Sequence, residues 1–408
     1  MSSSVVVTEK RKNNPDSLIL KGTLLVSSTF TVLAGAAIAP ALPALTEAFA
    51  DTPNVDFLVR FVLTLPALFI ALGAPLAGFI VDKFGRKPLL IISAVVYGFA
   101  GGSGYFVDQI WALLIGRALL GIAVAGVMTT VTTLIADYYQ RKERSSFLGI
   151  QAAFSGMGGV VFLSLGGFLA DLGWRTPFLI YMLSFLVLPF MITSLYEPAL
   201  SKQDGQQKST PTNVTLPVGL LAFAYSAMLL TQIVFYAVPV QLPFYLGDLV
   251  GATGSQSGMA IAGLSLFFSI ASASYGWFDR QLNHLYTMLL GFTLTGIGFI
   301  LLTLAGDWLL IAIGLPVSGF GLGLVVPNII TWIAEGVSET VRGRALGGVT
   351  TSLFLGQFLS PFFVTPLSNQ TGEGGVYAAL GVFLLISVVV AFFLRGAINN
   401  LTHINLEE

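Results

Sequence analysis

The sequence predicts an all-α membrane protein with twelve transmembrane helices in two six-helix pseudo-repeats. Three observations predict this fold: the composition, a series of twelve apolar segments, and an internal repeat with an offset of about 198 residues. Of the 408 residues, 55% are hydrophobic and only 10% are charged. Soluble domains have about 25% charged residues. The composition therefore favours a chain that lies mostly within lipid.

Polar residues divide the chain into apolar segments long enough for a helix to cross a bilayer, which takes roughly 20 residues. A segment in lipid must satisfy its own backbone hydrogen bonds, so each segment is expected to be helical. A β-barrel would show short alternating segments instead. In order, the predicted spans are 19–46, 57–81, 88–107, 110–136, 146–170, 175–195, 216–246, 255–278, 285–304, 308–334, 343–367 and 375–395.

The first 17 residues are polar, and the long apolar run after them is followed by many others. We therefore interpret this run as a retained helix and not a cleaved signal.

Charged residues separate the predicted spans. In the N-terminal half the separating charges are Glu47, Asp51 and Asp56, then Asp82, Lys83, Arg86 and Lys87, then Asp108, then Asp137, Arg141, Lys142 and Arg144, then Asp171 and Arg175. In the C-terminal half they are Asp248, then Asp279 and Arg280, then Asp307, then Glu335, Arg342 and Arg344, then Glu373.

Lysine and arginine set the orientation, because cytoplasmic loops of membrane proteins are enriched in them. With the N-terminus in the cytoplasm, 16 of the 19 basic residues fall on the cytoplasmic side, and only Arg60, Arg117 and Arg175 do not. We therefore expect both termini in the cytoplasm. The membrane is expected to be the plasma membrane, which is the inner membrane of a bacterium.

The chain divides at 197–214, its only long polar interruption, which we interpret as a cytoplasmic linker between bundles at 1–196 and 215–408. Residues of the first bundle recur in the second about 198 positions later. The recurring pairs are Gly116 and Gly314, Gly121 and Gly319, Asp137 and Glu335, Arg144 and Arg342, and Gly158 and Gly356. Two parallel halves with a site between them are typical of one class of secondary transporter.

The most informative segment is the loop after the second span, which has the spacing G-x-x-x-D-x-x-G-R-K from Gly78 onward. We expect Gly78 to allow close helix approach and Gly85 to allow a tight turn with positive φ. Asp82 and Arg86 are one helical turn apart and can pair if the second helix continues that far. The alternative is that these charges only fix the topology.

This loop resembles the signature of the major facilitator superfamily. The resemblance implies the twelve-helix fold of that family, working by alternating access. It also implies a conformational latch formed by Gly78, Asp82, Gly85 and Arg86 with an acid at the end of the fourth helix, which is Asp137 here. In the family the acid of the loop also meets the start of the eleventh helix, near residue 343, where the helix dipole is positive.

Arg117 lies inside the fourth predicted span, where an arginine is costly and is a functional candidate by default. The surrounding segment, 113–121, resembles the fourth-helix motif of the family, and the resemblance implies a role in proton coupling. We expect the side chain to point toward the first span or the cavity. Two alternatives remain: a structural arginine bonded to carbonyls of the first span, and one that reaches the outer surface.

Two other segments resemble motifs of the twelve-helix drug:proton antiporters of this superfamily. Pro40 and Pro43 would bend the outer half of the first span. The fifth span has the glycine spacing of the antiporter motif, but Phe162 and Leu163 replace its central Gly-Pro pair. The first segment favours drug export, and the second departs from the pattern.

Polar and aromatic side chains inside the spans are candidates to line a substrate cavity. Gln232 and Tyr236 form the best pair, because residues four apart share one face of a helix. Each candidate could instead contact only a neighbouring helix. The full set is Gln151, Tyr225, Gln232, Tyr236, Gln241, Asn328, Trp332 and Gln357.

Several other functions lack the residues they need. The chain has no cysteine, which excludes disulfides and thiolate metal sites. Its two histidines, His284 and His403, are expected in a loop and in the tail, so no metal or other cofactor is expected. The net charge of −1 gives no basis for nucleic-acid binding. Without a phosphate-binding loop or a paired nucleophile and base, we expect no enzyme.

We predict a monomeric secondary transporter that exports small apolar or amphipathic compounds, with protons as the coupling ion that the resemblance implies and with lipid around it. No aspartate or glutamate falls in the middle of a predicted span, so no acidic proton carrier is identified. The alternatives are uptake, export of a specific metabolite or siderophore by the same fold, and lipid flipping.

Overall fold

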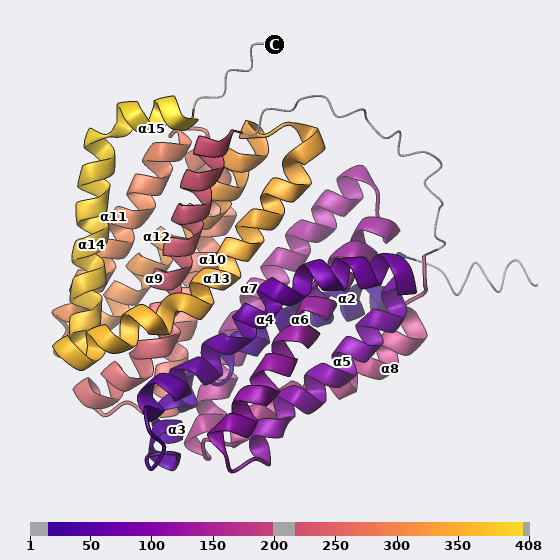
Figure 1. Cartoon of the computed structure of the whole chain (residues 1–408), viewed down its shortest axis with the longest axis horizontal. Coiled ribbons are helices and arrows are strands. Elements are labelled where there is room, and N and C mark those ends of the chain that lie inside the picture. Colours follow the sequence, from indigo (N-terminus) through magenta and orange to yellow (C-terminus); the bar gives the residue numbers. More distant parts are fainter. Residues whose placement is uncertain (1–14, 199–216, 403–408) are drawn as a thin grey trace, which may run out of the picture. The chain divides into compact units, whose positions relative to one another are not determined.

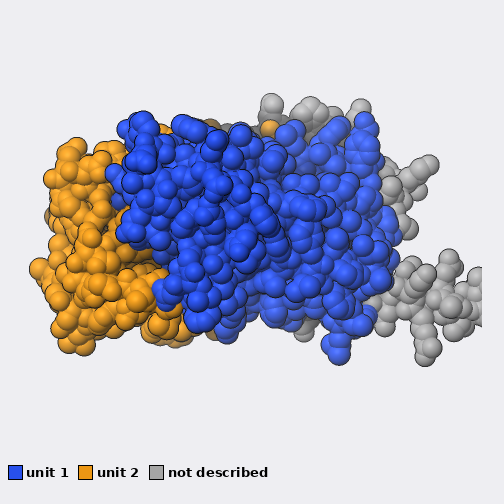
Figure 2. All heavy atoms as spheres, turned by 90° about the horizontal axis from the view of Figure 1, so that it is seen from below, with its two compact units in different colours: residues 1–200 blue, residues 201–408 orange. Residues whose placement is uncertain are grey.

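The computed structural model describes residues 15–198 and 217–402. Within these ranges every regular element is a helix and no strand occurs, so the predicted fold class is confirmed. The chain forms two compact units, unit 1 at residues 1–200 and unit 2 at residues 201–408, which Figure 2 shows in different colours. In the described part of the chain, twelve helices, six in each unit, are long and apolar enough to cross a membrane.

Unit 1 contains long α-helices and three short 3₁₀ turns, shown in indigo to magenta in Figure 1. In order they are α2 (Leu18–Ala36), η1 (Ala39–Ala41), α3 (Leu42–Ala48), α4 (Val55–Phe84), α5 (Arg86–Gly102), η2 (Ser103–Tyr105), α6 (Ile110–Tyr138), α7 (Arg141–Asp171), η3 (Thr176–Met182) and α8 (Leu183–Ser194).

Unit 2 consists of α-helices only among the residues described, shown in red-pink through orange to yellow in Figure 1. In order they are α9 (Val218–Val250), α10 (Gly254–Asp279), α11 (His284–Thr303), α12 (Trp308–Gly336), α13 (Glu339–Thr371), α14 (Glu373–Phe393) and the short α15 (Arg395–Thr402).

The first and sixth spans are interrupted where the sequence places proline. The first span stops as an α-helix at Ala36, passes through η1 with Pro40 near its start, and resumes as α3 with Pro43 in its first turn. Proline has no backbone N–H and clashes with the preceding turn, so it breaks the regular helix. The bend expected of Pro40 is therefore a short 3₁₀ segment. The sixth span likewise begins as η3, with Pro177 at its start.

The two units repeat one pattern of helix contacts. In unit 1, α6 packs against α4 and α5, and α2 packs against α7. In unit 2, α12 packs against α10 and α11, and α9 packs against α13. The second and third spans of each unit therefore flank its fourth, and the first lies against its fifth. The internal repeat of the sequence corresponds to a repeat of packing.

One pair of repeated glycines marks equivalent close contacts. A Cβ at Gly121 of α6 would lie 2.4 Å from the carbonyl oxygen of Pro66 on α4. A Cβ at Gly319 of α12 would lie 2.3 Å from the carbonyl oxygen of Leu264 on α10. Pro66 and Leu264 are themselves 198 positions apart. Small residues let the backbones of membrane helices approach closely, so both contacts require glycine.

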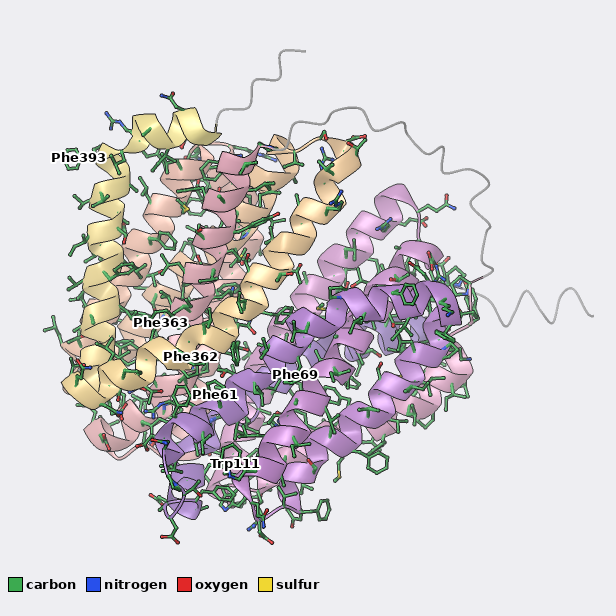
Figure 3. All side chains as sticks on the ribbon, in the orientation of Figure 1. Phe61, Phe69, Trp111, Phe362, Phe363 and Phe393 are labelled. Atoms are coloured by element: carbon green, nitrogen blue, oxygen red, sulfur yellow. The ribbon has the colours of Figure 1, made fainter. Side chains whose placement is uncertain are left out.

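Large apolar side chains are exposed on both units. Trp111, Phe363 and Phe393 are 61%, 55% and 79% exposed, and Figure 3 shows Phe393 projecting from the end of α14. Soluble monomers rarely expose contiguous apolar patches beyond a few hundred Å². Lipid provides an apolar surrounding for such side chains, which agrees with the length and composition of the helices.

Candidate functional site

The loop signature folds into a tight junction between two helices. α4 ends at Phe84 and α5 begins at Arg86, with only Gly85 between them at φ +96°. Glycine adopts positive φ at little cost because it has no Cβ. A Cβ at Gly85 would also lie 2.9 Å from Oε1 of Glu197. The turn expected at Gly85 is present, and the missing side chain leaves room for a carboxylate.

Arg86 connects this junction to the end of α6. Its Nε donates a hydrogen bond to Oδ2 of Asp137 at 3.0 Å, and the two groups form an ion pair. The Arg86 and Asp137 side chains are only 14% and 29% exposed. A charge-assisted hydrogen bond between partly buried groups is stronger than a surface ion pair. The structure thus brings together two of the residues assigned to the latch.

Glu197 caps the start of α5 and was not among the residues singled out in the sequence. Its two carboxylate oxygens accept hydrogen bonds from the backbone N–H groups of Arg86 and Lys87, at 2.7 and 2.8 Å. The first N–H groups of a helix lack partners within the helix and carry a positive partial charge. In the sequence Glu197 is only the first residue of the polar connection, and its one signal is an acid placed directly after a span.

Lys87 and a pair of tyrosines extend this contact to α8. Nζ of Lys87 donates to the carbonyl oxygens of Ile192 and Leu195, at 2.6 and 2.7 Å, where the last carbonyls of α8 lack helical partners. The rings of Tyr138 and Tyr196 stack with centroids 4.5 Å apart. The ends of α4, α5, α6 and α8 are therefore joined. We call Gly85, Arg86, Lys87, Asp137 and Glu197 the junction cluster.

Asp82 does not form the pair with Arg86 that the spacing suggested. The junction at Gly85 ends the helix before Arg86, so the two side chains do not share one helical face. Asp82 is exposed, and it makes no hydrogen bond or ion pair within 15–198 and 217–402. Nor does any atom outside the surrounding turns of α4 lie within 4 Å of a Cβ placed at Gly78. The close approach expected at Gly78 is therefore wrong for the described chain.

Arg117 is fully buried inside unit 1. Its Nη2 donates to the carbonyl oxygen of Gly101 on α5 at 2.8 Å. Its guanidinium lies 5.0 Å from the ring centroid of Phe178 and 4.7 Å from that of Tyr181, both in η3. Aromatic faces attract a cation, by about 2 kcal/mol or more when it is desolvated. Nε and Nη1 have no hydrogen-bond partner among the described protein atoms.

The expected direction of Arg117 was partly wrong. The side chain points into the bundle, but it contacts the third and sixth spans and not the first. Its link to the first span is indirect: Tyr181, which lies over the guanidinium, donates from its hydroxyl to the carbonyl oxygen of Ala34 at 3.1 Å. The sequence could not separate these directions, because they depend on the rotation of α6 about its axis.

The helix bounds agree with the absence of acids from the middle of the spans. Every described aspartate or glutamate within a helix lies in its first or last turn, from Asp56 at the start of α4 to Glu373 at the start of α14. A carboxylate at the centre of a bilayer is costly. The described helices therefore carry carboxylates only near their ends.

Two candidate cavity residues meet in unit 2. Nε2 of Gln357 on α13 donates to Oε1 of Gln232 on α9 at 3.2 Å. Tyr236 lies one turn beyond Gln232 and is half-buried, as is Gln357. The structure therefore places these three neutral polar side chains on the two helices that correspond to the first and fifth spans of this unit.

Other candidates have partners elsewhere. Gln241 is fully buried and donates to Oγ of Ser368 at 3.1 Å. Tyr225 donates to the carbonyl oxygen of Ala345 at 2.9 Å. Gln151 is half-buried on α7, far in sequence from the others. The hydrogen bonds of Gln241 and Tyr225 hold α9 to α13, and Gln241 has no exposed surface.

Asn328 and Trp332 lie near the end of α12 instead of halfway along it. Their side chains are 0% and 9% exposed, and both contact His284 at the start of α11. That histidine was expected in a loop, but it is the first residue of a helix. His284, Asn328 and Trp332 therefore form a separate group where α11 begins and α12 ends.

Comparison with known sequences agrees with this architecture. A sequence model described as Major Facilitator Superfamily matches residues 24–245 and again residues 224–403. The tetracycline resistance protein, class E, of Escherichia coli is 25% identical over 378 residues, which cover 88% of this chain and 92% of that protein. The quinolone resistance protein NorA of Staphylococcus aureus (strain COL) is 25% identical over 327 residues, covering 78% and 82%.

Solved structures of transporters share the fold. A bacterial homologue of the human lysosomal transporter Spinster has a TM-score of 0.75 at 15% identity, covering 94% of this chain and 96% of that one. A D-xylose–proton symporter has a TM-score of 0.74 at 18% identity, covering 91% and 97%. At such low identity the likeness concerns the arrangement of helices alone.

Proposed function

The chain belongs to the major facilitator superfamily, and from that premise we propose that it exports small apolar or amphipathic compounds in exchange for protons. It is a secondary transporter, as the family match and the twelve membrane-spanning helices indicate. The observation that carries the choice of substrate is the likeness to two resistance proteins along more than four-fifths of their lengths.

The side chains at the Gln232–Gln357 contact support a neutral substrate. We propose that Gln232, Gln357 and Tyr236 contact the transported compound, because they offer hydrogen bonds without charge. Gln357 and Tyr236 are half-buried, whereas Gln232 is 4% exposed. A strongly anionic substrate would need several buried cations. Arg117 is held by a carbonyl and two aromatic rings, so it supplies no open anion site.

We propose that the junction cluster is the latch of alternating access. Arg86, Asp137 and Glu197 make unit 1 rigid at this end. Asp82 stays exposed beside them, and its proposed partner is the positive N-terminus of α13 in one state of the transport cycle. A contact that forms in only one state changes the balance between states.

Proton coupling is assigned to Arg117 together with acids near the helix ends. A nearby cation lowers the pKa of a carboxyl group, so movement of a guanidinium can change which acid holds a proton. Asp56, at the start of α4, is a candidate partner.

We also propose that both termini are cytoplasmic, which puts 16 of the 19 basic residues on the cytoplasmic side. The protein is proposed to lie in a plasma membrane as a monomer.

Transport by purified protein in liposomes tests the proposal. An imposed pH gradient should drive uptake of a tetracycline or a fluoroquinolone, and Arg117→Gln should slow this uptake. Xylose serves as a matched substrate of a different class. Movement of xylose, or drug movement that does not depend on the pH gradient, would contradict drug–proton exchange.

Because the chain has no cysteine, single cysteines introduced at Ser17 and Asp51 would report the orientation of the protein by labelling from each side of the membrane.

A further inference from the structure

In unit 2, a polar group around His284 lies at the position in the repeat that Arg86 and Asp137 occupy in unit 1. His284 lies 198 positions after Arg86, and Glu335 lies 198 positions after Asp137. In both units the pair joins the start of the third span to the end of the fourth. The repeat therefore replaces an arginine, which always stays charged, with a histidine.

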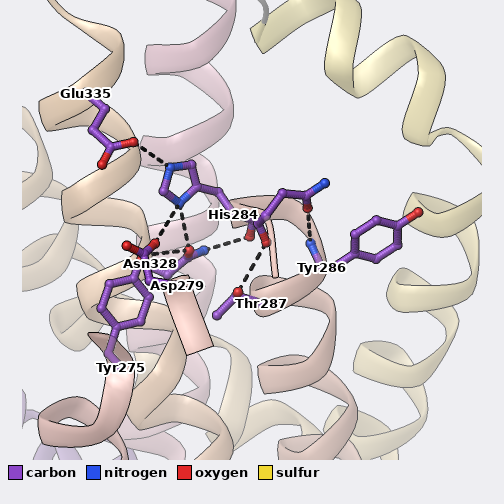
Figure 4. Close-up of polar contacts among 8 residues, drawn as sticks. Tyr275, Asp279, His284, Tyr286, Thr287, Asn328 and Glu335 are labelled. Carbon is purple, nitrogen blue, oxygen red and sulfur yellow. Dashed lines mark hydrogen bonds and ion pairs between the residues drawn. The ribbon is translucent and has the colours of Figure 1, made fainter. Parts of the chain in front are cut away.

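Acceptor atoms lie on both sides of the His284 ring, as Figure 4 shows. Its Nε2 is 3.1 Å from Oε2 of Glu335 on α12. Its Nδ1 is 3.1 Å from Oδ1 of Asn328, also on α12, and 3.8 Å from Oδ1 of Asp279 on α10. We call these four residues the histidine cluster. It joins three helices through one ring.

The orientation of the Asn328 amide is fixed by its other contact. Nδ2 of Asn328 donates to the backbone carbonyl oxygen of His284 at 2.9 Å. A carbonyl oxygen only accepts hydrogen bonds, so the nitrogen of the amide must face it and the amide oxygen must face the ring. Tyr275 directs its hydroxyl toward Asp279, with a 2.7 Å hydrogen bond, so the Asp279 oxygen acts as an acceptor there as well.

Both ring nitrogens of His284 therefore face acceptors. A neutral imidazole has one N–H, whereas an imidazolium has two. With a single proton on the ring, either Glu335 or Asn328 would face a bare nitrogen lone pair. We propose that the histidine cluster is a proton-binding site, in which His284 and Glu335 together hold one proton more than a neutral ring and a carboxylate.

Acidic and aromatic side chains surround the ring. Carboxylates approach it from α10 through Asp279 and from α12 through Glu335. The Trp332 ring stacks on His284 with centroids 5.5 Å apart and planes 24° apart, and an aromatic face attracts a cation. The remaining titratable neighbour is Tyr275. No lysine or arginine makes a hydrogen bond or ion pair with the ring in the described part of the chain.

Protons can reach the cluster from water. The Glu335 side chain is 64% exposed, while that of His284 is 20% exposed. The turn between α10 and α11 follows an even number of spans, as the junction at Gly85 does, so both belong to the same side of the membrane. In the proposed orientation this side is the cytoplasm. Only the choice of side rests on the proposed function; the proton site itself does not.

The consequence is a pH-dependent contact among α10, α11 and α12. When the ring is charged, two ion pairs hold the three helices together. When it is neutral, one of the contacts is lost. Histidine changes charge near neutral pH in proteins, so transport should respond to the pH on this side through unit 2, while the Arg86 pair of unit 1 does not respond. This regulation goes beyond the exchange of substrate for protons.

Nitrogen NMR of the full chain in lipid nanodiscs tests the proton site directly. The chain has two histidines, so His403→Gln leaves His284 as the only ¹⁵N-histidine signal. We expect both ring nitrogens to show imidazolium shifts at the acidic end of a titration from pH 5 to pH 8, and a neutral ring at the basic end. A ring that stays neutral across this range would overturn the proposal.

Transport assays test the consequence separately. At a fixed pH gradient, the wild-type rate should vary with the pH on the His284 side. His284→Arg and His284→Gln should both lose this dependence, the first keeping the rate of the acidic wild type and the second that of the basic wild type. His403→Gln should behave as wild type. A protonated ring with unchanged pH dependence in both variants would refute regulation, while leaving drug export intact.

Discussion

Two arginines of unit 1 are held by different kinds of partner, and the difference follows from their depth. Arg86 lies at a helix end and pairs with the carboxylate of Asp137. Arg117 lies inside a span and is held by the Gly101 carbonyl and two aromatic rings. Acids are costly at that depth, so carbonyl oxygens and ring faces replace them. Arginine therefore fixes a helix junction in one place and is buried among aromatic rings in the other.

Two glycines of the loop signature should respond differently to alanine. Gly85→Ala should destabilise the protein by roughly 1–3 kcal/mol, because φ +96° and ψ 162° are open almost only to glycine and the new Cβ would lie 2.9 Å from the Glu197 carboxylate. Gly78→Ala should stabilise it by about 0.5–1 kcal/mol, since the position is helical and open. Thermal unfolding of the purified variants measures both effects. Equal effects would contradict the role assigned to Gly85.

The Glu197 cap makes a separate prediction. Glu197→Ala should remove two hydrogen bonds to the start of α5 and cost about 1 kcal/mol, the usual size of a cap. Asp51→Asn is the matched control, because Asp51 is an exposed acid in a loop. The melting temperature should fall for Glu197→Ala alone. Unchanged stability would mean that the carboxylate does not hold α5.

At the scale of helices, the repeat makes one pair of contacts equivalent. Gly121→Ala and Gly319→Ala should each destabilise the protein by about 1–3 kcal/mol, the usual cost of overpacking. Each Cβ would meet a backbone carbonyl oxygen, at 2.4 and 2.3 Å, which cannot rotate away. Gly149→Ala, with no atom within 4 Å, is the control. If only one of the two variants melted early, the units would not share this packing.

A single glycine decides where α4 ends and α5 begins. The Gly85 junction separates α4 from α5 with a single residue, and this break turns Arg86 away from Asp82 and toward Asp137. A continuous helix would have placed Asp82 and Arg86 on one face. The partner of the arginine is thus chosen by a break in the helix and by the neighbouring α6.

At the scale of the whole molecule, Asp82 should affect transport without affecting folding. It is exposed and makes no hydrogen bond or ion pair within the described residues, so Asp82→Asn should leave the melting temperature unchanged. Transport should nevertheless fall strongly, because the proposed latch uses its charge against the dipole of α13 in one state. Drug uptake at matched protein amounts measures this. Normal uptake would remove Asp82 from the latch, and an early melt would make it a structural residue.

Sequence alone determined the twelve apolar spans, the repeat at 198 residues and the position of the loop signature. These features depend on local composition and on register, since any helix in lipid must be apolar and must satisfy its own hydrogen bonds. The turn at Gly85 was also predictable, because only the local backbone decides it. The superfamily followed from the spacing of that loop.

The partners of the polar residues were decided only by the tertiary structure. Glu197 meets α5 although 110 residues separate it from Lys87, and His284 meets Glu335 from 51 residues away. Arg117 contacts the third and sixth spans, whereas the first span or the cavity was expected. The physical reason is that such contacts depend on how each helix is rotated and how far it extends, and packing against the neighbouring helices sets both.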